Sequence, residues 1–276
     1  MTIGKDSVVV ITGAASGIGR ALALRLSKEQ IAGIAISDVD DAGLAETASL
    51  IKGTRASTHG VDVSKLDDIT RLAEEVISAH GRATHLVNNA GVGILGTFEQ
   101  LSLDDFEWLM GINYWGVVYA CKVFMPILRE QRHAHIVNVS SVFGLIAPPE
   151  QSAYCSSKFA VRGFTESLRN EMLGSNIAVS CVHPGGIKTN IVRNSRVGTG
   201  APTEWKAQGT KFFDKVARTT PEAAAEAIVK GIKAGEPRIL IGADAKAISL
   251  LSRLFPRKHL KMLERLSGHK MSLRKE

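Results

Sequence analysis

Short runs of β-branched residues alternate with longer segments of helical periodicity along almost the whole chain. This alternation is typical of βαβ units, which build a parallel sheet covered by helices on both faces. Right-handed crossovers then wind the strands into a doubly wound α/β domain. The seven expected strands lie in "SVVVIT", "GIAISD", "STHGVDV", "THLVNNAG", "AHIVNVSS", "IAVSCVHPGG" and "RILIG", and a long helical stretch at about 104–129 precedes the fifth.

Length and composition fit one such domain. The 276 residues, 45% hydrophobic and 22% charged, suffice for one large core, and no repeat or linker divides them. We therefore expect a single domain over 1–245 and an extension over 246–276. Neither a signal segment nor an apolar run that spans a bilayer is visible, which favours a cytoplasmic protein. The three cysteines and eight histidines lack metal-ligand spacing, so we expect no metal.

A glycine-rich turn, "TGAASGIG", follows the first expected strand and opens a helix. Gly13, Gly17 and Gly19 permit a tight turn and bring backbone close to a pyrophosphate at the helix N-terminus. Asp38 ends the second expected strand, where an aspartate accepts hydrogen bonds from both adenosine ribose hydroxyls and repels a 2′-phosphate. This favours NAD over NADP, although a solvated strand-end aspartate is the alternative. The neighbouring positions are also not basic: Ala15, Ser16 and Val39.

Two later strand ends extend the expected nucleotide site. Asp62 is placed to hold the adenine amino group, with Val63 beside the ring. Asn89 to Gly91 let backbone approach the cofactor, although an ordinary strand-to-loop turn explains the same residues.

Tyr154 precedes Lys158 by four residues in "AYCSSKFAV". Residues i and i+4 share one face of a helix, although such a pair is also common on amphipathic helices without any function. A free phenol has a pKa of about 10, too high for a base at neutral pH, and a nearby positive charge stabilises the phenolate. The pair is therefore a candidate acid/base in which Lys158 lowers the pKa of Tyr154.

These motifs occur in the order found in a known family. TGAASGIG, NNAG, a serine thirteen residues before YCSSK, and PGG after the next strand resemble the short-chain dehydrogenase/reductase family over about 6–245. The glycine spacing is similar to that of its compact dehydrogenase branch. The resemblance implies a Rossmann fold, NAD(P)-dependent hydride transfer between an alcohol and a carbonyl compound, and a homodimer or homotetramer.

The resemblance assigns residues to two groups. The catalytic tetrad is Asn113, Ser141, Tyr154 and Lys158. The cofactor-binding residues, besides Tyr154 and Lys158, are Gly13, Ser16, Gly17, Ile18, Gly19, Asp38, Asp62, Val63, Asn89, Ala90, Gly91, Pro184, Gly185, Ile187 and Thr189. A complete tetrad argues against the alternative function, a non-catalytic dinucleotide-binding sensor or scaffold.

Two of the four assignments have a competing interpretation. Ser141 ends an expected strand and is placed to orient a substrate oxygen toward Tyr154, whereas Ser140 should point to the opposite side of the strand. Asn113 lies within a helical pattern, where an asparagine is usually a surface residue. The resemblance implies that it interrupts the helix and holds a water in a proton relay from Lys158.

The expected substrate side is apolar. The apolar side chains on this side favour a lipophilic alcohol or ketone of steroid, retinoid or fatty type as the substrate. The loop at about 186–216 would close over the bound substrate as a lid. Simple packing explains the same residues equally well. They are the segments 92–98 and 142–149, with Trp205, Phe212 and Phe213.

The extension at 246–276 carries nine basic residues against two acidic ones and accounts for the whole net charge of +7. Its apolar residues form two helical stripes: Ile248, Leu251, Leu254 and Phe255, then Leu260, Leu263 and Leu266. Such a basic amphipathic segment favours peripheral contact with an anionic membrane, a subunit contact, or a lid over the substrate. Nucleic acid is not an expected partner, because the remainder of the chain is charge-balanced.

Overall fold

The computed structural model describes residues 3–267 and contains one seven-stranded sheet. All neighbouring strands are parallel, in the order β3-β2-β1-β4-β6-β7-β9. The predicted doubly wound parallel sheet of seven strands is therefore confirmed. The strands are β1 (Val8–Thr12), β2 (Gly33–Asp38), β3 (Arg55–Gly60), β4 (His85–Asn88), β6 (Ala134–Val139), β7 (Ile177–Pro184) and β9 (Arg238–Ile241).

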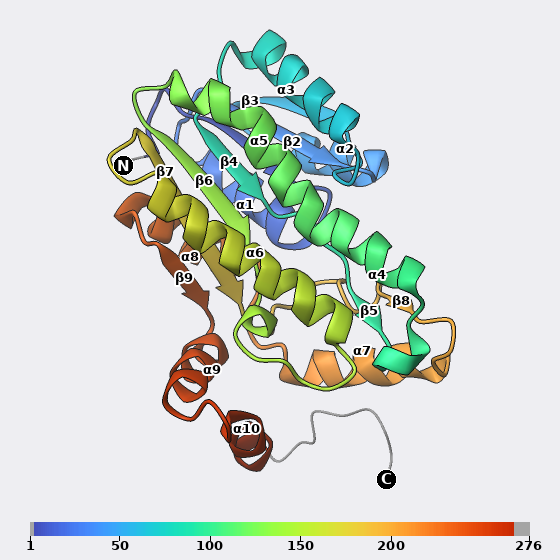
Figure 1. Cartoon of the computed structure of the whole chain (residues 1–276). Helices are drawn as coiled ribbons and strands as arrows, with labels where there is room; N and C mark the ends of the chain where they lie inside the picture. The colour runs from blue at the N-terminus through green and yellow to red at the C-terminus, as the bar shows by residue number, and fades with distance from the viewer. Residues whose placement is uncertain (1–2, 268–276) are drawn as a thin grey trace.

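Helices cover both faces of the sheet (Figure 1). α1 and α8 share one apolar core with the sheet, and α3, α5 and α6 share the other. The α-helices are α1 (Gly17–Ser27), α2 (Asp41–Leu50), α3 (Leu66–His80), α4 (Leu103–Met110), α5 (Gly116–Arg129), α6 (Ser152–Glu171), α7 (Glu204–Val216), α8 (Pro221–Ala234), α9 (Ala243–Leu254) and α10 (His259–Ser267). Shorter helical segments are η1 (Phe98–Gln100), the π-helix η2 (Gly111–Trp115) and η3 (Val142–Gly144).

The strand order reverses between β1 and β4. β2 and β3 lie beyond β1 on one side, and β6, β7 and β9 lie beyond β4 on the other. In such sheets ligands bind outside the carboxyl ends of the strands at this reversal. The loops after β1, β2, β4, β6 and β7 all leave this same edge, so the topology gathers the predicted motifs there.

Two parts of the fold differ from prediction. β5 (Ile94–Leu95) and β8 (Arg196–Val197) form a separate two-stranded parallel sheet, and α7 lies within the segment expected to be a loop at about 186–216. β3 ends at Gly60, so the "VDV" expected to close or follow this strand follows it. A two-residue strand has no detectable period, which is why β5 and β8 leave no mark in the sequence.

The predicted C-terminal extension forms two helices joined by a turn at 255–258 where the structure describes it. α9 begins at Ala243, just before the expected boundary, and α10 follows. Three of the nine basic residues lie outside the described residues: Lys270, Arg274 and Lys275. Of Leu266, in the predicted stripe, only the backbone is described. Between residues 3 and 267, no helix combines the length and the apolar composition needed to cross a bilayer.

Two buried histidines make the stability of the fold sensitive to acid. His85 and His135 are register partners on β4 and β6, and burial lowers their pKa values to about 4 and about 3. The unfolded chain, with histidine pKa values of about 6.5, binds more protons below that pH, so stability falls as the pH drops from about 6.5 toward about 4. We expect the pair to contribute roughly 4 kcal/mol of this loss between pH 7.5 and pH 5.

Urea denaturation at these two pH values tests the prediction. The double variant His85→Asn, His135→Gln should show a smaller loss of unfolding free energy than the wild type, whatever its stability at pH 7.5. An equal loss in both proteins would show that these histidines do not carry the acid sensitivity.

Candidate active site

Asn113 lies in the π-helix between α4 and α5 and is fully buried. Its Oδ1 accepts a hydrogen bond from the Val92 backbone N–H (2.8 Å), and its Nδ2 donates to the Val92 carbonyl (3.0 Å) and to Ser157 Oγ (3.1 Å). The interruption of the helix implied by the resemblance is therefore present. The side chain joins the loop after β4 to the residue next to Lys158, and sequence reasoning missed Ser157 as this link.

Tyr154 and Lys158 lie one turn apart on α6. Lys158 is buried, its Nζ lies 5.8 Å from the centroid of the Tyr154 ring, and it donates a hydrogen bond to the Val139 carbonyl (3.1 Å). A Cβ on Gly91 would lie 3.2 Å from Asn113 Oδ1 and 3.3 Å from Lys158 Nζ. The tetrad's amide and ammonium groups thus converge beside Gly91.

Burial shifts the pKa values of this pair in opposite directions. Burial raises the pKa of Tyr154 to about 12. A hydrogen bond with Ser141 acts in the opposite direction but is the smaller effect. Burial lowers the pKa of Lys158 to about 8, which leaves the ammonium mostly protonated at neutral pH. The net direction for Tyr154 is opposite to the expected lowering, because the cost of burying a phenolate outweighs the stabilising contacts within the chain.

The two serines after β6 point to different neighbours. Ser141 caps η3 by accepting a hydrogen bond from the Phe143 N–H (3.1 Å), and its hydroxyl is the group bonded to Tyr154. Ser140 Oγ donates instead to the Lys158 carbonyl (2.8 Å), on α6. The structure therefore brings Ser141, and not Ser140, to the phenol.

His183, near the end of β7, was not predicted as part of the site. It is fully buried, and its Nδ1 lies 3.0 Å from the Ser141 carbonyl. Because a carbonyl oxygen only accepts, Nδ1 carries the proton and the ring is held as that neutral tautomer. Burial lowers the pKa of His183 to about 4, which keeps it neutral at physiological pH. It fixes the backbone from which the Ser141 hydroxyl reaches Tyr154.

The glycine-rich turn is shaped by close backbone contacts. A Cβ on Gly13 (φ 68°) would lie 2.6 Å from Ala90 Cα, and one on Gly19 would collide with the Gly13 carbonyl. Ser16 is the N-cap of α1 but makes no capping hydrogen bond, so its side chain leaves the first N–H groups of the helix uncapped. Ile18 packs against the core. The turn therefore fits the pyrophosphate of a dinucleotide.

The NNAG segment is tied directly to this turn. Thr12 Oγ1 accepts hydrogen bonds from the N–H groups of Asn89 and Ala90, both at 3.1 Å. Asn89 Nδ2 donates to the carbonyls of Thr12 (3.0 Å) and Gly13 (2.9 Å). Asn89 and Ala90 therefore hold the glycine turn in position.

Asp38 ends β2 beside the glycine turn. Its Oδ2 accepts a hydrogen bond from the Ala15 N–H (3.0 Å), and its Oδ1 accepts from the Val39 N–H (2.8 Å). Oδ1 also accepts from the Asp40 N–H (3.2 Å), so the remaining capacity for a ribose hydroxyl lies on Oδ2. Sequence reasoning missed one cation at this corner: Arg20 donates to the Ala15 carbonyl (2.5 Å) and pairs with Glu46 (2.7 Å).

Asp62 and Val63 make local contacts. Asp62 Oδ1 accepts hydrogen bonds from the Ser64 N–H (3.0 Å) and Ser64 Oγ (2.7 Å). The Val63 side chain lies in the core, where a Cβ on Gly116 would approach it within 2.9 Å. The expected positions beside an adenine ring stay a prediction.

The PGG segment extends from Pro184, the last residue of β7, and returns toward the glycine turn. Ile187 is buried and bridges Thr219. Gly185 packs closely against Asp244 of α9, whose Oδ2 accepts a hydrogen bond from the next N–H, of Gly186 (2.7 Å).

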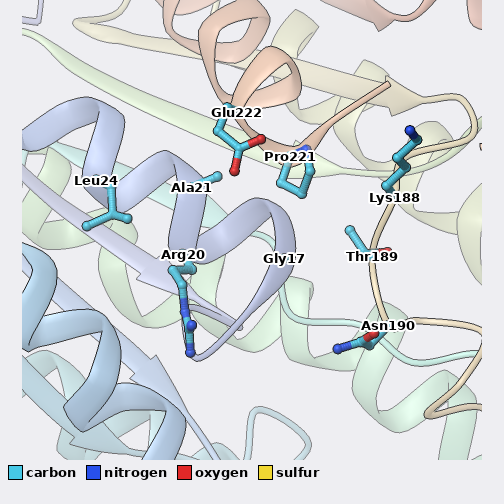
Figure 2. A pocket seen from close by; sticks show the side chains of 9 residues that line it. All are labelled: Gly17, Arg20, Ala21, Leu24, Lys188, Thr189, Asn190, Pro221 and Glu222. Atoms are coloured by element: carbon cyan, nitrogen blue, oxygen red, sulfur yellow. The ribbon is translucent and has the colours of Figure 1, made fainter. Parts of the chain in front are cut away.

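Figure 2 shows a pocket of about 190 Å³ between the first turns of α1, the loop after β7 and the start of α8. Gly17 and Thr189 both line it, and a Cβ on Gly17 would lie 3.2 Å from Thr189 Cγ2. Two predicted cofactor-binding segments, distant in sequence, are therefore neighbours at this edge. None of the tetrad residues lines this pocket.

Apolar side chains pack against Tyr154. Phe143 packs edge-on against the Tyr154 ring (6.2 Å between centroids), and a buried cluster around Ile94 and Leu109 contacts Tyr154. The segment at 186–216, expected to act as a lid, is held by the pairing of β8 with β5 and by an ion pair between Arg193 and Asp214 (2.6 Å). Of the predicted lid aromatics, Trp205 is buried, whereas Phe212 and Phe213 are partly exposed.

Comparison with known proteins shows the family to which the chain belongs. Residues 7–199 match the model of the short chain dehydrogenase family. SadH of Mycobacterium tuberculosis is 44% identical over 91% of each chain, and estradiol 17-beta-dehydrogenase 11 of Pongo abelii is 30% identical over 94% of this chain and 82% of its own. A short-chain dehydrogenase/reductase from Burkholderia phymatum, solved in complex with NAD, is 27% identical and superposes over the whole of both chains with a TM-score of 0.81. The chain belongs to the short-chain dehydrogenase/reductase family of oxidoreductases, whose cofactor is a nicotinamide dinucleotide.

Proposed function

We propose that the protein interconverts a secondary alcohol and a ketone, with NAD as the preferred cofactor and a lipophilic molecule as substrate. The observation that carries this proposal is that the Tyr154 phenol lies close to the Ser141 hydroxyl and the Lys158 ammonium group and packs against a cluster of apolar side chains. A bound nicotinamide dinucleotide supplies the hydride acceptor or donor and, when oxidised, a positive charge beside the phenol.

Each residue of the tetrad has a distinct task. Tyr154 takes the hydroxyl proton of an alcohol, or returns it to a ketone oxygen, and Ser141 orients that oxygen. Lys158 stabilises the phenolate, which burial otherwise disfavours. Asn113, joined to the Lys158 turn through Ser157, is proposed to hold a water that relays the proton from Lys158 to solvent.

NAD preference rests on Asp38. Its carboxylate is fixed by three backbone N–H groups beside the glycine turn, where a 2′-phosphate would meet like charge. Arg20, the nearby cation, is already paired with Glu46. The NAD complex of the Burkholderia relative is consistent with this preference.

The lipophilic substrate rests on the apolar cluster around Tyr154, and a relative named for estradiol supports it. A series of secondary alcohols that differ by single methylene groups tests it. Each methylene that enters the pocket should raise kcat/KM by roughly fourfold, the equivalent of about 0.8 kcal/mol. Rates that fall with apolar length, and rise with added hydroxyl or carboxylate groups, would assign a polar substrate instead.

A homodimer or homotetramer is proposed through the outer faces of η2 and α6. Trp115 and Phe159 remain 46% and 40% exposed there, and Trp115 stacks on Tyr119 of α5. Exposed aromatics of this kind are enriched in subunit interfaces. Light scattering of the wild type should give at least a dimer mass, and Trp115→Glu should lower it, whereas a monomeric wild type would contradict this assembly.

A further inference from the structure

The end of α9 presents large apolar side chains to solvent. Leu250, Leu254 and Phe255 are 57%, 60% and 42% exposed. Leu250 and Leu254 are four residues apart and share a helix face, and Phe255 follows the helix directly. Ile248 and Leu251, two members of the predicted stripe, are partly buried instead.

Exposed cations are frequent in the same segment of the chain. The acidic residues of the segment at 243–265 are only Asp244, which bonds the Gly186 N–H, and Glu264. Six exposed basic residues lie in the same segment: Lys246, Arg253, Arg257, Lys258, Lys261 and Arg265. We call Leu250, Leu254 and Phe255 together with these six residues the tail surface.

The tail surface lies at the same edge of the molecule as the candidate active site. α9 follows β9 at the carboxyl end of the sheet and packs against η3, whose Phe143 contacts Tyr154. α10 packs against α9 and extends away from the sheet (Figure 1). A partner bound to the tail surface would therefore lie close to the substrate side of the site.

We propose that the tail surface docks on an anionic lipid bilayer, with its apolar side chains inserted at the headgroup boundary and its cations against the phosphates. Apolar insertion combined with basic residues is the chemistry of peripheral membrane helices. A second copy of the chain fits less well, because it would bring two strongly basic surfaces together. Nucleic acid would match the cations but leave the three apolar side chains without a partner. The inference does not depend on the identity of the substrate.

Flotation of the full-length protein with vesicles tests this proposal. We expect it to float with phosphatidylcholine vesicles containing about one third phosphatidylglycerol, to stay behind with phosphatidylcholine alone, and to be released by high salt. Two double variants, Leu254→Ser with Phe255→Ser and Arg257→Glu with Lys258→Glu, should each lower the partition coefficient at least roughly tenfold.

Matched substitutions elsewhere serve as controls. Leu173→Ser removes a side chain that is 76% exposed beyond α6, and Lys28→Glu with Lys52→Glu reverses two exposed charges. Both control proteins should float like the wild type, and circular dichroism checks that every variant is folded. The proposal is overturned if the wild type does not float with anionic vesicles at low salt, or if the tail variants float as well as the controls. A tail-dependent dimer mass without flotation would assign the surface to a second copy.

Discussion

Replacing Tyr154 with phenylalanine is expected to lower kcat by roughly 10²- to 10⁴-fold while leaving NADH binding nearly unchanged. The substitution removes only the hydroxyl, which Ser141 contacts and which exchanges the substrate proton in the proposed mechanism. The ring keeps its packing against Phe143. Steady-state kinetics gives the loss of turnover, and fluorescence titration with NADH gives the binding.

The chain offers a matched control for this experiment. Tyr119→Phe on α5 removes a hydroxyl from one of the other two tyrosines, outside the tetrad. It should retain wild-type turnover. If Tyr154→Phe keeps most of its activity as well, Tyr154 is not the acid/base and the mechanism proposed for the tetrad fails.

Asp38→Ala is expected to lower kcat/KM for NAD by roughly 10- to 100-fold and to raise it for NADP. Hydrogen bonds to a charged group contribute about 1.5–3 kcal/mol, and the same change removes the negative charge that repels a 2′-phosphate. Arg20, bonded to the Ala15 carbonyl and paired with Glu46, is a cation at this corner. Initial rates with each cofactor at saturating alcohol measure the preference.

Asp41→Ala is the control for Asp38→Ala, because it removes a neighbouring carboxylate from the first turn of α2. It should leave the ratio of NAD to NADP activity unchanged. If the wild type has the same kcat/KM for NADP as for NAD, the role given to Asp38 is contradicted before any variant is made.

The sequence predicts the sheet and the placement of the motifs because both depend on strong local signals. Glycine spacing, β-branched strands and the Tyr154–Lys158 spacing each extend over a few neighbouring residues. Parallel topology then brings the carboxyl ends of all strands to one edge of the sheet. The meeting of residues from β1 to β7 can therefore be predicted from topology alone, without side-chain contacts.

The missed features depend on contacts between distant segments. His183 reaches the Ser141 carbonyl only because β6 and β7 pair in their particular register. Asp244 reaches the PGG segment because α9 begins directly after β9, which pairs with β7. The direction of the Tyr154 pKa shift depends on burial, which the spacing of two residues does not reveal.

The most direct test of the central claim is NADH formation by the purified protein from NAD and a panel of secondary alcohols, once NADH binding has been verified. The proposed function predicts turnover that increases with the apolar size of the alcohol and is much slower with NADP. Tight NADH binding with no turnover of any alcohol, and no oxidation of NADH by the matching ketones, would contradict it. That result would favour a non-catalytic dinucleotide sensor.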